Sequence, residues 1–100
     1  MALAIEPGGW SDLRVIELSG DIDAEQAAQL TIVLEALADD GWSGVVIDLG
    51  NADDLSADAV AVLVRARRRG LDVRCDPVSP AARRVLAATG AALVLGVALS

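Results

Sequence analysis

The stretch DLSADAVAVL is the first place where this sequence could carry chemistry. Its one hydroxyl, Ser56, lies two residues after Asp54 and two residues before Asp58. A hydroxyl there could accept a phosphoryl group. It could equally cap a helix, because a short hydroxyl just before a helix accepts a backbone N–H of the first turn. The residues leave both roles open and favour the cap.

Four carboxylates around this hydroxyl raise a second question, that of a metal site. Asp48, Asp53, Asp54 and Asp58 could bind Mg²⁺, since hard cations prefer carboxylate ligands. No glycine-rich loop with a lysine accompanies them to hold a phosphate. Acidic residues at a helix start are also stabilised by the helix dipole. These carboxylates could therefore stabilise the start of a helix, form a recognition surface or bind a metal. We favour the first role and expect no metal and no cofactor.

The composition narrows the classes of function. The chain has 100 residues and is 54% hydrophobic, which predicts one domain spanning residues 1–100. A net charge of −7 disfavours nucleic acid as a partner, because phosphate binding needs surplus basic charge. The absence of histidine excludes histidine-based acid–base catalysis and histidine-containing metal sites. We therefore predict no catalytic residues and no enzymatic activity.

Cysteine content and the chain termini bear on localisation. One cysteine cannot form an internal disulfide, which fits a reducing compartment. The first residues, MALAIEPGG, lack the positive charges of a signal peptide. The apolar run over residues 91–99 is shorter than the ~20 residues of a membrane helix. We expect a cytoplasmic protein that does not insert into a membrane.

Strands and helices alternate along the chain. Residues 3–6 and 13–20 read as strands, and a helix starts after Asp23, with Gln26 completing a capping box. The unbroken apolar residues 45–47 predict a strand covered on both faces. A helix over 57–69, a short strand over 71–75 and a helix capped by Ser79 follow. Residues 93–99 read as a final short strand or a packed tail. This order predicts an α/β fold with a mostly parallel sheet and crossover helices.

The helix over 57–69 is apolar on two sides. Val60 and Val64 lie on one side, whereas Ala59, Val62 and Ala66 lie on the other, where a surface helix would be polar. Either the helix is buried on both sides, or the side with Val62 meets a partner. Both readings stay open, and we predict a partner surface there.

Three stretches resemble a known family in their order and spacing. VIELSGDIDAEQAAQL, GVVIDLGNADDLSADAVAVLVRARRR and DPVSPAARRVLAATG are similar to stretches of STAS domains, the fold of bacterial anti-sigma factor antagonists. The resemblance implies a STAS-like mixed, mostly parallel sheet of four to five strands flanked by helices. It also implies a protein-binding module, because many members bind an anti-sigma factor kinase through the start of the second helix. That kinase phosphorylates a serine or threonine in the family's DSSG motif.

The sequence departs from that motif where the switch would lie. A gap-free match puts Ser56 on the motif's Asp, Ala57 on its first Ser, Asp58 on the second Ser (the usual phosphoacceptor) and Ala59 on its Gly. Asp58 thus occupies the phosphoacceptor position with a fixed charge, and Ser56 is the alternative phosphoacceptor. The resemblance, together with the apolar second side of the helix, gives the predicted partner-binding residues Asp21, Asp23, Asn51, Ser56, Ala57, Asp58, Ala59 and Val62.

The resemblance leaves several functions in competition. The first is a regulatory module that binds an anti-sigma factor kinase or a stressosome-like component in a bacterial signalling system. The second is a STAS subunit that docks on the ATPase of an ABC-type transporter. The third, disfavoured, is a small Mg²⁺-dependent acidic enzyme. A homodimer is left open.

Overall fold

The computed structural model describes residues 2–7 and 13–97. Five strands and four helices follow one another in the described chain. In order they are β1 (Ala2–Pro7), β2 (Leu13–Ile22), α1 (Ala24–Asp39), β3 (Gly44–Leu49), β4 (Ala52–Leu55), α2 (Ala57–Arg68), β5 (Asp72–Val78), α3 (Pro80–Ala88) and α4 (Ala91–Val94).

The strands form a mixed, mostly parallel sheet in the order β1-β2-β3-β5. The edge strand β1 runs antiparallel to β2, whereas β2, β3 and β5 are mutually parallel. The short β4 pairs in parallel with the end of β2. The predicted α/β fold class is confirmed, including the mixed sheet of four to five strands.

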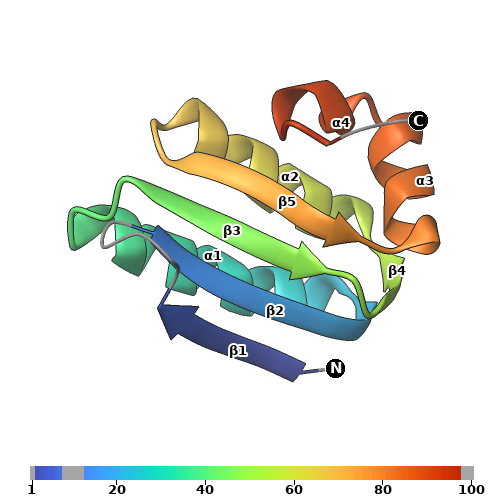
Figure 1. The fold of residues 1–100 in the computed structure, drawn as a ribbon, viewed down its shortest axis with the longest axis horizontal. Coiled ribbons are helices and arrows are strands. Elements are labelled where there is room, and N and C mark those ends of the chain that lie inside the picture. Colours follow the sequence, from blue (N-terminus) through green and yellow to red (C-terminus); the bar gives the residue numbers. More distant parts are fainter. Residues whose placement is uncertain (1, 8–12, 98–100) are drawn as a thin grey trace.

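Both long helices cover the same face of the sheet, behind the strands in Figure 1. The side chains of Ile16, Val45 and Ile47 on that face are fully buried. Val46 and Asp48 alternate with them along β3 and are only half-buried. The prediction that β3 is covered on both faces is therefore wrong, because both crossover helices pack on one side.

Three polar side chains cap the three longer helices. Asp23 Oδ1 accepts a hydrogen bond from the Gln26 N–H at 3.0 Å, and Ser56 Oγ accepts from the Ala59 N–H at 3.1 Å. Ser79 caps α3 in the same way. The predicted helix starts are confirmed, and so is the cap role of Ser56. The capping box is only half formed, because Gln26 Oε1 is buried without a hydrogen-bond partner.

Two elements differ from the sequence prediction. The segment between β3 and α2, for which the sequence predicted no element, contains β4. The C-terminal segment, predicted as a short strand or a packed tail, begins with the helix α4 and forms no strand within the described residues. Leu95 beyond α4 is 1% exposed, so this segment packs on the core. Residues 98 and 99 of the predicted segment lie outside the described residues. Among the helices of the described residues, none has the length and apolar character needed to cross a membrane.

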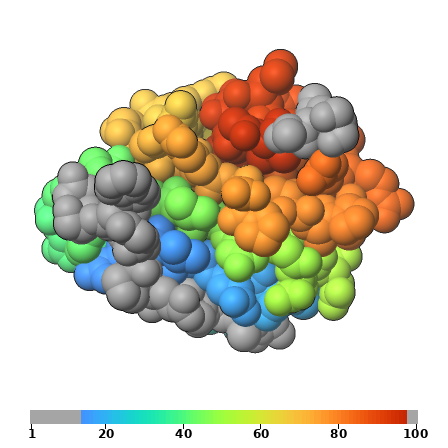
Figure 2. Space-filling model, viewed as in Figure 1, coloured from blue at the N-terminus to red at the C-terminus, as the bar shows by residue number. Residues whose placement is uncertain are grey.

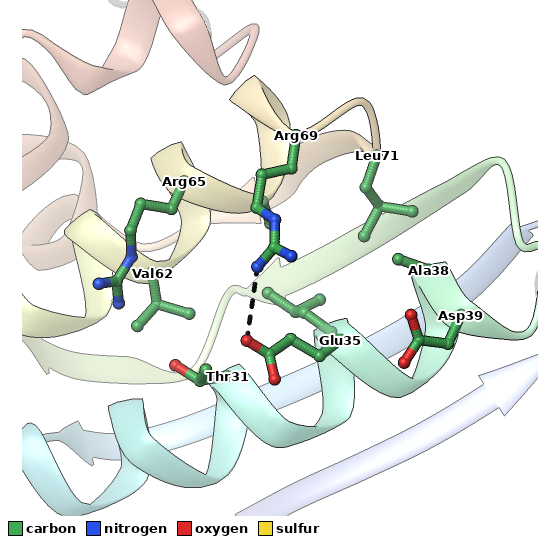
Figure 3. A pocket seen from close by; sticks show the side chains of 10 residues that line it. Thr31, Glu35, Ala38, Asp39, Val62, Arg65, Arg69 and Leu71 are labelled. Carbon is green, nitrogen blue, oxygen red and sulfur yellow. Dashed lines mark hydrogen bonds and ion pairs between the residues drawn. The ribbon is translucent and has the colours of Figure 1, made fainter.

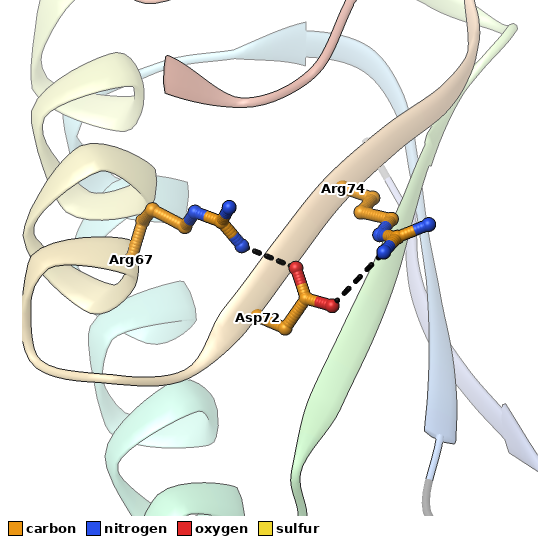
Figure 4. A network of polar contacts seen from close by, with 3 residues as sticks. All are labelled: Arg67, Asp72 and Arg74. Carbon is orange, nitrogen blue, oxygen red and sulfur yellow. Dashed lines mark hydrogen bonds and ion pairs between the residues drawn. The ribbon is translucent and has the colours of Figure 1, made fainter.

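Two arginines at the C-terminal end of α2 form ion pairs with different neighbouring elements, β5 and α1. Arg67 forms an ion pair with Asp72 at the start of β5, and Asp72 also pairs with Arg74 at 3.3 Å (Figure 4). On another side of the helix, Arg69 reaches Glu35 of α1 at 3.5 Å. These pairs are solvent-exposed and each stabilises the fold by less than about 1 kcal/mol.

Ser79 joins two elements that are far apart in sequence. Its Oγ donates a hydrogen bond to the Ala52 carbonyl of β4 at 2.7 Å and accepts one from the Ala82 N–H at 3.1 Å. The residue is 8% exposed, whereas the Asp23 cap is exposed. A buried hydrogen bond that loses one partner leaves the other unsatisfied, which costs more than losing an exposed cap.

We therefore expect Ser79→Ala to destabilise the protein by about 2 kcal/mol or more, against about 1 kcal/mol for Asp23→Ala. Urea denaturation of both variants and the wild type measures the difference. Equal losses for the two variants would show that the Ser79–Ala52 bond contributes nothing beyond the cap.

We expect the single cysteine to be unreactive in the native protein. Burial raises the pKa of the Cys75 thiol from 9.0 to about 12, and the thiolate is the reactive form. At pH 8 the thiolate fraction falls about a thousandfold. Iodoacetamide should therefore label the native protein far more slowly than the urea-unfolded protein. Equal labelling rates would contradict the burial of Cys75.

Candidate partner-binding edge

The pairing of β4 with β2 brings the two main candidate segments together. Asp21 lies opposite Asp54, and the Gly20 N–H donates to the Asn51 carbonyl at 3.0 Å. The Ser56 N–H donates to the Ile22 carbonyl at 2.9 Å. Figure 2 shows the two segments, light blue and yellow-green, side by side at one end of the molecule. We call residues 20–23 together with 51–58 the acidic edge.

The acidic edge exposes five carboxylates, those of Asp21, Asp23, Asp53, Asp54 and Asp58. Two of them are engaged by the backbone, since Asp23 caps α1 and Asp54 Oδ1 accepts from the Leu55 N–H at 2.8 Å. Within the described chain, the side chains of Asp21, Asp53 and Asp58 make no hydrogen bond or ion pair. These three carboxylates are therefore available to a partner. Asp53 was absent from the predicted partner-binding residues, because the sequence did not reveal the strand β4 that presents it.

The start of α2 presents its first turn to solvent. Ala57 and Asp58 are exposed, and Asn51 is exposed on the neighbouring turn. Asp58 lies in the first turn of the helix, where the dipole stabilises a negative charge. Ser56 is half-buried, and its Oγ is held by the cap hydrogen bond. The geometry thus gives Asp58, rather than Ser56, the more accessible side chain.

The carboxylates do not converge on a common point. In the part of the chain that the structure describes, no three side chains of the types His, Cys, Asp or Glu lie close enough to hold a metal ion. Asp48 turns its Oδ1 to the Gly50 N–H at 2.9 Å. The magnesium-site alternative therefore has no geometric support among these residues.

Two of the expected partner-binding residues belong to the core. Ala59 is 0% and Val62 6% exposed, and Ala66 packs partly buried against the same core. Val62 lies beside Thr31 and Leu34 of α1. The expectation that this side of α2 faces a partner is wrong, because α1 packs against it while Val60 and Leu63 face the rest of the core.

Comparisons with known proteins agree with this fold. A family model described as "Mlab, STAS domain" matches residues 11–96. No curated protein matches the chain. One similar structure is the unphosphorylated anti-sigma factor antagonist SpoIIAA, at 18% identity and a TM-score of 0.77, over 89% of this chain and 81% of that one. Another is an anti-sigma factor antagonist from Mycobacterium paratuberculosis, at 23% identity and a TM-score of 0.79, over 99% of this chain and 86% of that one. At such identities the two structures establish the fold alone.

The burial of Val62 predicts a large stability loss on introducing a charge there. Val62→Asp should cost about 3 kcal/mol or more, because it buries an unpaired carboxylate. Ala61→Asp is the matched control at an exposed neighbouring position, and should cost less than about 1 kcal/mol through helix propensity. Thermal and urea unfolding of both variants measure the effect. If Val62→Asp were as stable as Ala61→Asp, the Val62 side of α2 would be exposed to solvent and the burial described above would be contradicted.

Proposed function

This chain belongs to the STAS domain family, and we propose that it is a non-enzymatic regulatory module that binds a protein partner through the acidic edge. Within that family, we propose that it resembles the anti-sigma factor antagonists. The partner is then an anti-sigma factor kinase or a stressosome-like component, in the bacterial cytoplasm.

The observation that carries this proposal is the position of Asp58. Its carboxylate is exposed in the first turn of α2, and the resemblance of the sequence to the family's DSSG motif assigns this position to the phosphoacceptor. A phosphoserine carries about −1.5 to −2 charge at neutral pH, whereas a carboxylate carries one and extends less far. Asp58 is thus a partial and permanent mimic of the phosphorylated state. For a kinase that releases its phosphorylated antagonist, this chain is a partner held in the weak-binding state.

The rest of the acidic edge fits a docking surface better than a catalytic one. Asp21 and Asp53 offer free carboxylates beside Asp58, and Asn51 and Ala57 are exposed next to them. The chain has no histidine and no lysine, which removes the commonest general bases and amine nucleophiles. The proposal therefore assigns these residues to recognition.

A second candidate function is docking on the ATPase of an ABC-type transporter. It is favoured by the description of the matched family model, which names Mlab rather than an anti-sigma factor antagonist. The acidic edge would serve either partner. Binding to a purified anti-sigma kinase or to a purified transporter ATPase distinguishes the two functions directly.

The proposal predicts that Asp58→Ser tightens binding to a cognate anti-sigma kinase. Removing the fixed charge should strengthen the complex about tenfold, or about 1.4 kcal/mol, because an unmatched charge no longer has to be desolvated at the interface. Isothermal titration of the kinase with wild type and variant measures this change. The kinase should also incorporate phosphate into the Asp58→Ser variant and not into the wild type.

Asp40→Ser provides a control for the loss of one exposed carboxylate, at the opposite end of α1. Its affinity should equal that of the wild type. Weaker binding by Asp58→Ser would show that a cation of the partner pairs with Asp58, which would refute the locked-switch role. Equal affinities of the wild type and Asp58→Ser would show that Asp58 only stabilises the start of α2 and plays no part in binding.

A further inference from the structure

The outward face of the two long helices carries an ordered pattern of side chains. On α1, Ala28, Ile32, Glu35 and Asp39 follow one another at helical spacing, and all four are exposed. Ala61 and Arg65 of α2, with Arg69 at its C-cap, form the corresponding exposed row. We call these two rows together the helical face. Each row is apolar or small in its first half and charged in its second half, with opposite charges on the two helices.

A groove of about 510 Å³ separates the two rows. Leu34, Val62 and Leu71 line it between the helices, while Glu35 and Arg69 face each other across it (Figure 3). Their ion pair is long, at 3.5 Å, and both side chains are more than half exposed. Within the described chain, Asp39 and Arg65 make no ion pair. The groove therefore has an acidic wall and a basic wall whose charges are only partly neutralised.

The two helices run in the same direction. Each connects parallel strands by a crossover on the same face of the sheet, so both run opposite to the strands. The Arg69–Glu35 pair also shows that these two residues lie at the same height along the groove. Consider a second copy related by a two-fold axis that runs parallel to the groove. This rotation places α1 of one copy against α2 of the other, and it leaves the position of each residue along the groove unchanged.

We propose that the helical face binds a second copy of this chain in such a two-fold arrangement. Glu35 of each copy then meets Arg69 of the other, and Asp39 lies one turn away from the same guanidinium. Ala28 packs against the small Ala61 of the other copy. Ile32, which is 69% exposed in the single chain, is covered by the methylene stem of Arg65. Self-complementarity of this kind is what an isologous interface requires.

The net charge of −7 does not prevent this association. At physiological ionic strength, charges more than about 8 Å apart are largely screened, whereas apposed pairs at contact distance are screened less. The two helices are about 24 and 18 Å long, from their 16 and 12 residues. With a diameter of about 10 Å per helix, the face measures roughly 20 by 24 Å, or about 480 Å², which is smaller than a standard interface of about 800 Å² per partner. Because small interfaces bind weakly, we expect a dimer with a dissociation constant of about 10 µM. The dimer does not depend on the acidic edge or on the proposed partner.

Analytical ultracentrifugation over a concentration series tests the dimer. The wild type should move from 10.2 kDa towards twice that mass as its concentration rises. The double variant Glu35→Arg/Asp39→Arg makes both walls basic, and Arg65→Glu/Arg69→Glu makes both acidic. Each variant alone should dimerise at least tenfold more weakly, while circular dichroism shows an unchanged fold and thermal midpoint.

Mixing the two double variants provides the decisive measurement. A basic-walled copy and an acidic-walled copy restore opposite charges at both contacts, so the mixture should form a heterodimer as tight as the wild-type dimer. Native mass spectrometry separates the heterodimer from both homodimers by mass. Two controls match the changes in net charge away from the helical face, namely Asp21→Arg/Asp53→Arg on the acidic edge and Arg74→Glu/Arg84→Glu on β5 and α3. Both controls should dimerise as the wild type does.

Three results would overturn the proposal. The first is a wild type that stays monomeric up to 500 µM, about fifty times the expected dissociation constant. The second is folded double variants that do not combine on mixing. The third is a loss of dimer in the controls as large as in the helical-face variants, which would assign the association to net charge or to another surface.

Discussion

The parallel pairing of β4 with the end of β2 is the constraint on which the rest of this structure depends. Two backbone hydrogen bonds flank it, from Gly20 to Asn51 and from Ser56 to Ile22. The second bond fixes the residue that caps α2, and hence the direction in which the first turn presents Asp58. On its other side, β4 holds α3 through the bond from Ser79 to Ala52. One strand of four residues thereby positions the ends of two helices.

The packing of α2 then divides the surface into two separate regions. Its buried residues extend from the side that faces the sheet to the side that faces α1. The accessible residues of α2 are therefore those of the first turn, the outward row, and Arg67 and Arg68 in the last turn. The first turn joins the acidic edge, and the outward row joins the helical face. A partner at the edge and a second copy on the helices would therefore use different side chains. This separation would let a small domain bind two proteins without enlarging its core.

The sequence alone was sufficient to predict those features that depend on interactions between residues close together in the chain. A side chain three residues before a backbone N–H sets each helix start, so Asp23, Ser56 and Ser79 were recognisable as caps. β4 escaped prediction because its stability comes from a strand some 30 residues earlier in the chain. Its sequence, with two central aspartates, has low strand propensity. Side-chain packing and backbone pairing with distant segments override propensity in such short strands.

The sequence by itself determined the order of the main elements, the α/β class and the fixed charge at residue 58, since each follows from residue types at short spacing. The tertiary structure alone decided which side of α2 is buried, because alanine and valine suit both a core and an interface and only the neighbouring α1 distinguishes them. It also decided which acidic residues share an edge and which charges oppose each other across the groove. Those relations depend on distances between segments remote in sequence, and chain connectivity does not specify them.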